Sequence, residues 1–317
     1  MKSRFIFLCC FIVGIKAYDM RMLTVLTGPV GTQSLHQYLG HFGVTRSLIE
    51  GLKKSGISFN YNPQNVDQLG DVVHIVAGDG AVIQQIIDLK KSGHVKKIIV
   101  GPNAYNKSFV ANKNIDLRID PSEWVRDAHV LFYEELNQTD YLVWPAGVDE
   151  HYFDPKKMND YTSKRVLVYN KEQHDLTHRV VTLLKEYHFE PIVITYGSYH
   201  KEQFKRILET VSFAIFLSKT ESQGLALAEC WAMDVPTLCW NLKCPHKYLE
   251  IEYPVSSACP YLTQETGFSW KTITELEDML RHGVAYVKNC SPRNWVLKNM
   301  TDEIVVYKLI KAIKNLS

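Results

Sequence analysis

Short apolar runs alternate with amphipathic stretches along the chain from Met22 onward. In the amphipathic stretches, apolar residues recur at three- and four-residue spacing, as in a helix with one buried face. This alternation is typical of βα units built around a parallel sheet. The pattern predicts strands over 22–26, 57–61, 71–77, 97–100, 117–119, 142–145, 165–169, 191–196, 213–217 and 237–240. It predicts helices over 44–54, 82–89, 176–187, 203–210, 225–233 and 302–316, and another that starts after Ser122.

A polar stretch at 154–164 interrupts this alternation, which then restarts. We therefore expect an α/β protein with two tandem Rossmann-like domains, over 20–158 and 159–300, and a closing C-terminal helix over 301–317. The 317 residues are enough for two domains of about 150 residues each. Because ligands bind at the carboxyl ends of parallel strands, we expect the two domains to face each other across a cleft that holds the site.

The first nineteen residues have a different character. Lys2 and Arg4 precede an apolar run at 5–15, an order typical of a secretory signal peptide, and the run is too short to cross a membrane. Ala17 is small enough for cleavage, but Ile15 is not. The alternatives are a chain that starts at Met20 or Met22, or a segment that touches a membrane surface. A signal peptide would favour export or a secretory lumen.

Composition narrows the function classes. With 46% apolar and 22% charged residues, the chain is neither disordered nor fibrous. Lys and Arg total 36 against 34 Asp and Glu, with no block of one sign, so the charge does not favour a nucleic-acid partner. The seven cysteines include no C-x-x-C pair, so we expect neither a disulfide framework nor a structural zinc site.

The segment 221–229 carries the most chemical information, because it runs from a strand end into a helix. Unpaired N–H groups at a helix start bind anions, and Gly224 has no side chain to keep a diphosphate away from the backbone. Glu221 lies on the loop and Glu229 on the helix, where a carboxylate can accept both hydroxyls of a ribose. The alternative is that such acids only complement the helix dipole.

The full residue sequence of this segment is more specific than the spacing of its two glutamates. Glu221-Ser222-Gln223-Gly224-Leu225 and Glu229, followed by Val-Pro-Thr at 235–237, resemble the E-x7-E signature of retaining glycosyltransferases with the GT-B fold, the group-1 or GT4-like family. Pro-Ala-Gly-Val-Asp at 145–149, Pro-Ser-Glu-Trp-Val at 121–125 and Pro-Tyr-Leu at 260–262 resemble further marks of that family. The resemblance runs from Met22 to the end and is strongest over 213–240.

The resemblance implies roles for the second domain. Glu221 would contact the donor sugar as the catalytic residue, and Ser222 beside it would also bind the donor. The amides of Gly224 and Leu225 would hold the diphosphate, and Glu229 the ribose. The turn at Gly197 follows a strand where the family contacts the base, or it is an ordinary turn. Lys171 would neutralise phosphate or lie in solvent, because Tyr169-Asn170-Lys171-Glu172 departs from the family's Gly-Arg and Lys-Gly block.

In the first domain, the resemblance places the loop with Gly28 and Gly31 toward donor and acceptor, although a plain βα turn would have the same residues. Arg46 would reach a phosphate or an acceptor, or lie in solvent. The family often has a histidine after the mid-domain strand, whereas this chain has Gly101-Pro102-Asn103. Asn103 can bind a sugar hydroxyl but cannot act as a base. His74, inside a strand run, is expected in the core.

The leading hypothesis is transfer of a sugar from a nucleoside-diphosphate sugar to the hydroxyl of a glycan, lipid or small-molecule acceptor, with retention of configuration. Such a reaction needs no enzyme nucleophile, and we expect no metal and no cofactor other than the donor substrate. This chemistry favours a cytoplasmic or membrane-associated protein, in tension with a signal peptide. The alternatives are a non-catalytic nucleotide-sugar-binding or scaffold protein, suggested by the missing histidine, and a nucleotide-sugar epimerase.

Overall fold

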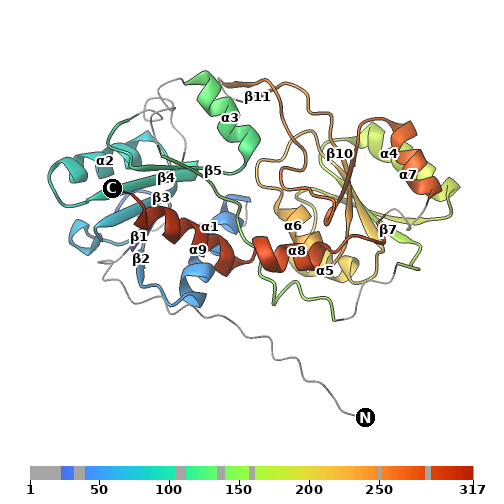
Figure 1. Ribbon diagram of the computed structural model, residues 1–317, viewed down its shortest axis with the longest axis horizontal. Coiled ribbons are helices and arrows are strands. Elements are labelled where there is room, and N and C mark those ends of the chain that lie inside the picture. The colour runs from blue at the N-terminus through green and yellow to red at the C-terminus, as the bar shows by residue number, and fades with distance from the viewer. Residues whose placement is uncertain are drawn as a thin grey trace, which may run out of the picture.

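The computed structural model describes residues 23–31, 40–104, 112–133, 140–156, 161–248, 251–282 and 287–316. The hydrophobic segment 1–19 lies outside them. The described chain forms two lobes, each built around one parallel sheet (Figure 1). This confirms the predicted α/β class with two Rossmann-like halves.

The first lobe has a six-stranded sheet in the order β2-β1-β3-β4-β5-β6, and every neighbouring pair is parallel. Its strands are β1 (Leu23–Leu26), β2 (Phe59–Tyr61), β3 (Val72–Gly78), β4 (Lys97–Ala104), β5 (Leu117–Asp120) and β6 (Tyr141–Val143). Its helices are α1 (Gly40–Lys54), α2 (Gly80–Lys91) and α3 (Glu123–Phe132), with a short 3₁₀ turn at Val66–Gln68.

The second lobe has a five-stranded parallel sheet in the order β13-β10-β9-β7-β8. Its strands are β7 (Arg165–Asn170), β8 (Glu190–Thr195), β9 (Phe213–Leu217), β10 (Thr237–Trp240) and β13 (Gly267–Trp270). Between β10 and β13 the chain forms a separate antiparallel pair, β11 (His246–Tyr248) and β12 (Ile251–Tyr253), and β12 packs against α3 of the first lobe. Its helices are α4 (His174–Glu186), α5 (Lys201–Leu208), α6 (Leu225–Ala232), α7 (Ile273–Arg281) and α8 (Pro292–Asn299).

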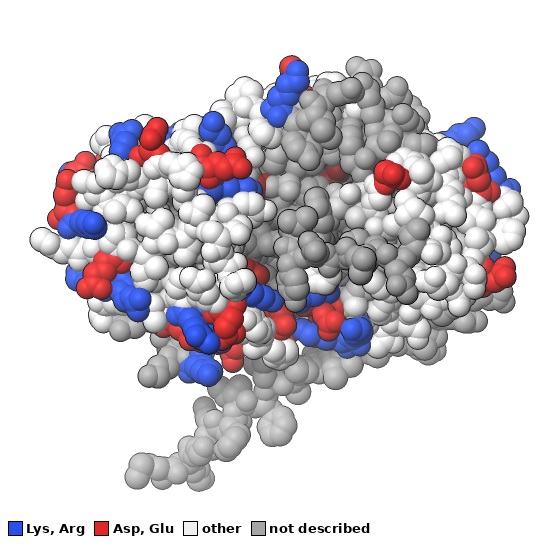
Figure 2. All heavy atoms as spheres, turned by 180° about the vertical axis from the view of Figure 1, so that it is seen from behind, with Lys and Arg blue, Asp and Glu red and all other residues white. Residues whose placement is uncertain are grey.

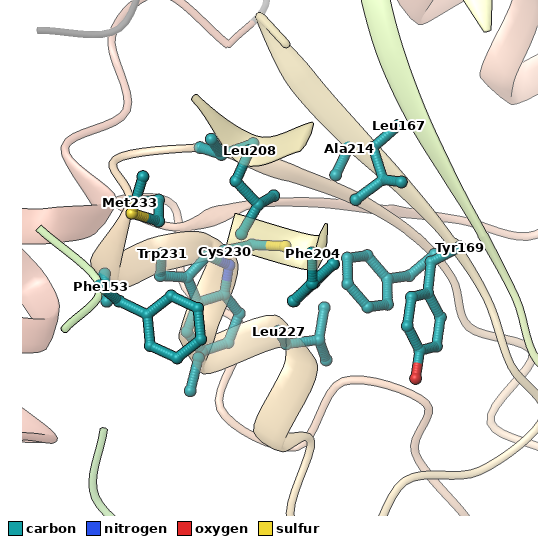
Figure 3. Close-up of a cluster of buried hydrophobic side chains, with 14 of the residues drawn as sticks. Phe153, Leu167, Tyr169, Phe204, Leu208, Ala214, Leu227, Cys230, Trp231 and Met233 are labelled. Carbon is teal, nitrogen blue, oxygen red and sulfur yellow. The ribbon is translucent and has the colours of Figure 1, made fainter. Parts of the chain in front are cut away.

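The helix that carries the predicted donor residues is fixed by a dense apolar core. Leu227, Cys230 and Trp231 of α6 belong to one buried cluster with Phe204 of α5 and Tyr169 of β7 (Figure 3). The Trp231 indole donates to Thr237 Oγ1 at 3.0 Å, so its one polar atom is satisfied inside the core. Because α6 packs this closely, its first turn and the loop before it are held against the sheet.

The last helix, α9 (Asp302–Lys314), leaves the second lobe and packs on the first (Figure 1). Val305, Val306 and Leu309 are buried in the same cluster as Leu48 of α1. The Trp144 indole donates to the Val305 carbonyl at 2.7 Å. The segment after β6 and the end of the chain therefore join the two lobes side by side.

Charge on the described surface is mixed in sign. Figure 2 shows basic and acidic side chains interspersed over one face, with neither sign forming a continuous patch. No helix within the described ranges is both long and apolar enough to cross a membrane.

Candidate functional site

The carboxyl ends of three neighbouring strands of the second lobe meet at one edge of its sheet. The register aligns Asn170 of β7 with Thr195 of β8 and with Leu217 of β9. Lys171, Tyr196 and the loop 218–224 follow these residues directly. The sheet therefore places side chains from three separate parts of the sequence at one place, as expected for a ligand site in a parallel α/β fold.

Glu221 and Lys171 form an ion pair at this edge. The Lys171 ammonium donates to Glu221 Oε1 at 2.9 Å, and Ser218 Oγ donates to the same oxygen at 3.2 Å. The side chains of Lys171 and Glu221 are 26% and 18% exposed, so the pair is accessible but partly shielded from water. The ammonium also lies 4.9 Å from the centre of the Tyr196 ring. Two residues predicted to contact different parts of a donor thus contact each other in this structure.

Gly224 ends the loop in a left-handed conformation, with φ 68° and ψ 42°, immediately before α6. A side chain is disfavoured in this conformation, so a glycine is needed to turn the chain into the helix. Ser222 is exposed on the loop, and Leu225 begins the helix and packs against the apolar cluster of the first lobe. The helix start therefore lies between the two lobes, and Gly224 is buried there beside Leu227 and Pro260.

Glu229 lies on α6 beyond its first turn, which contains no acidic residue. Because dipole effects decay within the first turn, the dipole gives little reason for an acid here. Burial raises the pKa of the Glu229 carboxyl to about 7, against the opposing effect of the Lys201 and Arg46 charges. At neutral pH this carboxyl is close to half ionised, and any group that donates hydrogen bonds to it would favour the charged form.

Two cations from different lobes face Glu229. Lys201 starts α5, and its ammonium lies 4.4 Å from the centre of the Tyr152 ring and 4.9 Å from that of Phe153. Burial lowers the pKa of Lys201, although the Glu229 charge opposes this. Arg46 on α1 donates to the buried Asp302 carboxylate at 3.2 Å. Arg46 is therefore tied into the lobe junction beside Glu229 rather than free in solvent.

The other predicted residues lie on separate turns and near a strand end. Gly197 has φ 79° and no atom within 4 Å of where a side chain would start, so its turn is open. Gly28 is buried, and Gly31 has φ 86° and donates its N–H to the Pro63 carbonyl at 3.1 Å. Asn103 is the penultimate residue of β4, and its buried Nδ2 finds no acceptor within the described chain.

The first lobe holds the 221–223 loop directly. The Trp124 indole of α3 donates to the Glu221 carbonyl at 3.1 Å, and the Ala146 N–H donates to Gln223 Oε1 at 2.9 Å. The Tyr261 hydroxyl of the second lobe donates to the Pro121 carbonyl of the first. Sequence reasoning missed Lys201, Trp124 and Gln223. The only signal for Lys201 was its position at a helix start after the Gly197 turn.

His74 occupies the core, as predicted. It is fully buried on β3, and its Nε2 is 2.8 Å from the Gly101 carbonyl oxygen. Burial lowers its pKa to about 4, so the ring is neutral at physiological pH. In the part of the chain that the structure describes, no three or more His, Cys, Asp or Glu side chains are grouped to hold a metal ion.

The raised pKa of Glu229 predicts how the free energy of unfolding depends on pH. Between pH 4.5 and about 7 the folded chain binds more protons at this residue than the unfolded chain, so stability falls as pH rises through that window. From pH 5 to pH 8 we expect the free energy of unfolding of the wild type to fall by about 2 kcal/mol more than that of Glu229→Gln. Each pKa unit of difference between the folded and unfolded chain corresponds to about 1.4 kcal/mol. Urea unfolding at the two pH values measures this, with the exposed Glu303→Gln as control. Equal losses in wild type and Glu229→Gln would show that the carboxyl is solvated.

Comparison with known proteins returns structural matches only. A scan of protein-family models and a search of curated proteins give no match. The lipopolysaccharide outer core galactosyltransferase WaaB superposes with a TM-score of 0.58 at 11% identity, over 92% of this chain and 99% of WaaB. HepE of Anabaena, solved with UDP and glucose, has a TM-score of 0.56 at 9% identity, over 93% of this chain and all of HepE.

A third structure, TarM from S. aureus, has a TM-score of 0.53 at 16% identity. The match covers 77% of this chain but only 55% of TarM, so this chain spans about half of that protein. Likeness at these identities concerns architecture alone. The chain has the GT-B fold, in which two Rossmann-like α/β domains with parallel sheets lie side by side.

Proposed function

We propose that the chain is a retaining glycosyltransferase that moves a sugar from a nucleoside-diphosphate donor to an acceptor hydroxyl, in the synthesis of a glycan or glycolipid. The observation that carries the proposal is the pair of carboxylates at the two ends of one loop–helix turn. Glu221 lies on the loop beside Lys171, and Glu229 lies on α6 with Gly224 between them. A nucleoside-diphosphate sugar has three parts to bind, the sugar, the diphosphate and the ribose. Glu221, the helix start at Gly224 and Glu229 follow one another along this turn in the same order.

Each residue has a role in this scheme. Glu221 accepts hydrogen bonds from hydroxyls of the donor sugar, and Glu229 accepts both ribose hydroxyls. The diphosphate lies at the amides of Gly224 and Leu225, where the helix start is electropositive. Lys171 then exchanges its bond to Glu221 for a phosphate oxygen. Solved GT-B neighbours with bound UDP, such as HepE, support a nucleotide sugar as the donor.

The chemistry requires positioning and charge stabilisation rather than a protein nucleophile. The acceptor oxygen attacks the anomeric carbon on the face from which the diphosphate departs, and a departing phosphate oxygen takes the acceptor proton. The negative charge that develops on the leaving group is stabilised by Lys171 and the first N–H groups of α6. The lobe junction holds donor and acceptor together, which supplies a large part of the rate enhancement.

A second candidate is a nucleotide-sugar-binding protein without turnover. It is favoured by the Lys171–Glu221 ion pair, which occupies both residues, and by Asn103 where a histidine would be expected. Incubation with UDP-glucose, GDP-mannose and ADP-glucose, followed by detection of released nucleoside diphosphate, separates the two. Release with one donor supports the enzyme, and saturable binding without release supports the binding protein.

A further inference from the structure

Gln223 has one half of its side-chain amide satisfied and the other half free. The residue is 7% exposed and lies between Glu221 and Gly224 on the donor loop. Its Oε1 accepts the Ala146 N–H at 2.9 Å, which fixes the orientation of the amide because only the oxygen can accept. Its Nε2 is buried and has no acceptor within the described chain.

A buried amide nitrogen without a partner is costly, by about 1–3 kcal/mol. Such groups are uncommon in folded proteins, and a contact with a ligand or an ordered water is one explanation for them. The cost is retained here at a loop that two hydrogen bonds tie to the first lobe, one from Trp124 and one from Ala146.

A second unsatisfied group lies on the facing segment of the first lobe. Ser122 is fully buried, makes no capping bond to α3, and leaves its Oγ without a partner in the described structure. Pro121 before it and Trp124 two residues after it are tied to the second lobe, since Pro121 accepts from Tyr261 and Trp124 donates to Glu221. The segments that carry Ser122 and Gln223 are therefore in contact across the junction.

We propose that Gln223 determines specificity by donating a hydrogen bond from Nε2 to a sugar hydroxyl oxygen, with Ser122 Oγ as a second contact. This rests on the proposed function. Both groups are neutral, which suits a hydroxyl better than a phosphate, and the ammonium of Lys171 at this loop is already paired with Glu221. The hydroxyl belongs to the transferred sugar or to a saccharide acceptor, which share this chemistry.

The test is Gln223→Glu, which keeps the oxygen that accepts from Ala146 and replaces the donor NH₂ by an acceptor. Calorimetry compares UDP with UDP-glucose, GDP with GDP-mannose and ADP with ADP-glucose. If the nitrogen contacts the transferred sugar, the variant binds the free diphosphate within twofold of wild type and the diphosphosugar at least tenfold more weakly. If it contacts the acceptor, donor binding and donor hydrolysis are unchanged and the acceptor KM rises at least tenfold. The exposed Gln203→Glu on α5 is the matched control.

Ser122→Ala provides a second test that remains valid if Gln223→Glu fails to fold. Ser122 Oγ makes no bond that the fold needs. We expect an unchanged melting temperature and at least threefold weaker binding of the same ligand. The inference would be overturned if Gln223→Glu bound both the diphosphosugar and the acceptor as the wild type does. It would also be overturned if the variant bound the free diphosphate and the diphosphosugar more weakly by the same factor. A wild type that binds no nucleotide would instead overturn the proposed function, and this inference with it.

Discussion

Glu221→Gln is expected to lower the rate of nucleoside-diphosphate release by at least about a hundredfold without loss of the fold. The substitution keeps the size of the side chain and an oxygen for Lys171 and Ser218, which bond Oε1 at 2.9 and 3.2 Å. It removes the negative charge. A charged contact that strengthens as the sugar becomes cationic is worth about 10²–10³ in rate. Initial rates with the accepted donor, at matched saturation, measure the loss.

Glu172→Gln is the matched control for this variant. Glu172 is exposed next to Lys171 and changes the net charge of the same edge by the same amount. We expect its rate within twofold of wild type. If Glu221→Gln turned over the donor as fast as the wild type, Glu221 would have no part in the reaction. Its ion pair with Lys171 would then be a structural contact only.

Glu229→Ala is expected to weaken nucleoside-diphosphate binding by about 10- to 150-fold, since a hydrogen bond to a charged group contributes about 1.5–3 kcal/mol. The effect is on affinity, because ribose lies away from the bond that breaks. The pKa of about 7 adds a pH signature. If the ribose diol binds the ionised carboxylate, affinity for the wild type rises by up to about tenfold from pH 6 to pH 8. Calorimetry at both pH values measures both effects.

Glu303→Ala serves as the control for this second variant, because Glu303 is an exposed acid in the first turn of α9. Unchanged nucleotide affinity in Glu229→Ala, or a pH dependence that survives the substitution, would contradict a contact with ribose. Glu229 would then be a half-buried acid balanced by Lys201 and Arg46 alone.

The sheets were largely predictable because their strands are nearly continuous apolar runs. Phe213–Leu217 is buried at every position and is apolar at every position, so its sequence alone identifies it. Gly267–Trp270 was not predicted as a strand, since its two middle residues are only partly buried or exposed and its run is short. The amphipathic pattern of α9 was visible, but its place on the first lobe was not, because that place depends on the apolar face of α1 more than 240 residues earlier.

The candidate site was predictable as a segment and not as a set of contacts. The order of strand, loop, Gly224 and helix follows from local sequence, and the structure has it. The Lys171–Glu221 pair joins residues 50 apart, and the Ala146–Gln223 bond joins residues 77 apart. Such contacts depend on strand register and on how the lobes dock. A sequence pattern specifies neither the strand register nor the docking of the lobes.

The most direct measurement is equilibrium binding of UDP-glucose, GDP-mannose and ADP-glucose to the wild type, each in competition with its free diphosphate. We expect one of the three to bind saturably, to be displaced by its own diphosphate, and to lose most of its affinity in Glu229→Ala. Absence of binding by every nucleotide sugar, or binding that is equal in wild type and Glu229→Ala, would contradict a donor site at the start of α6.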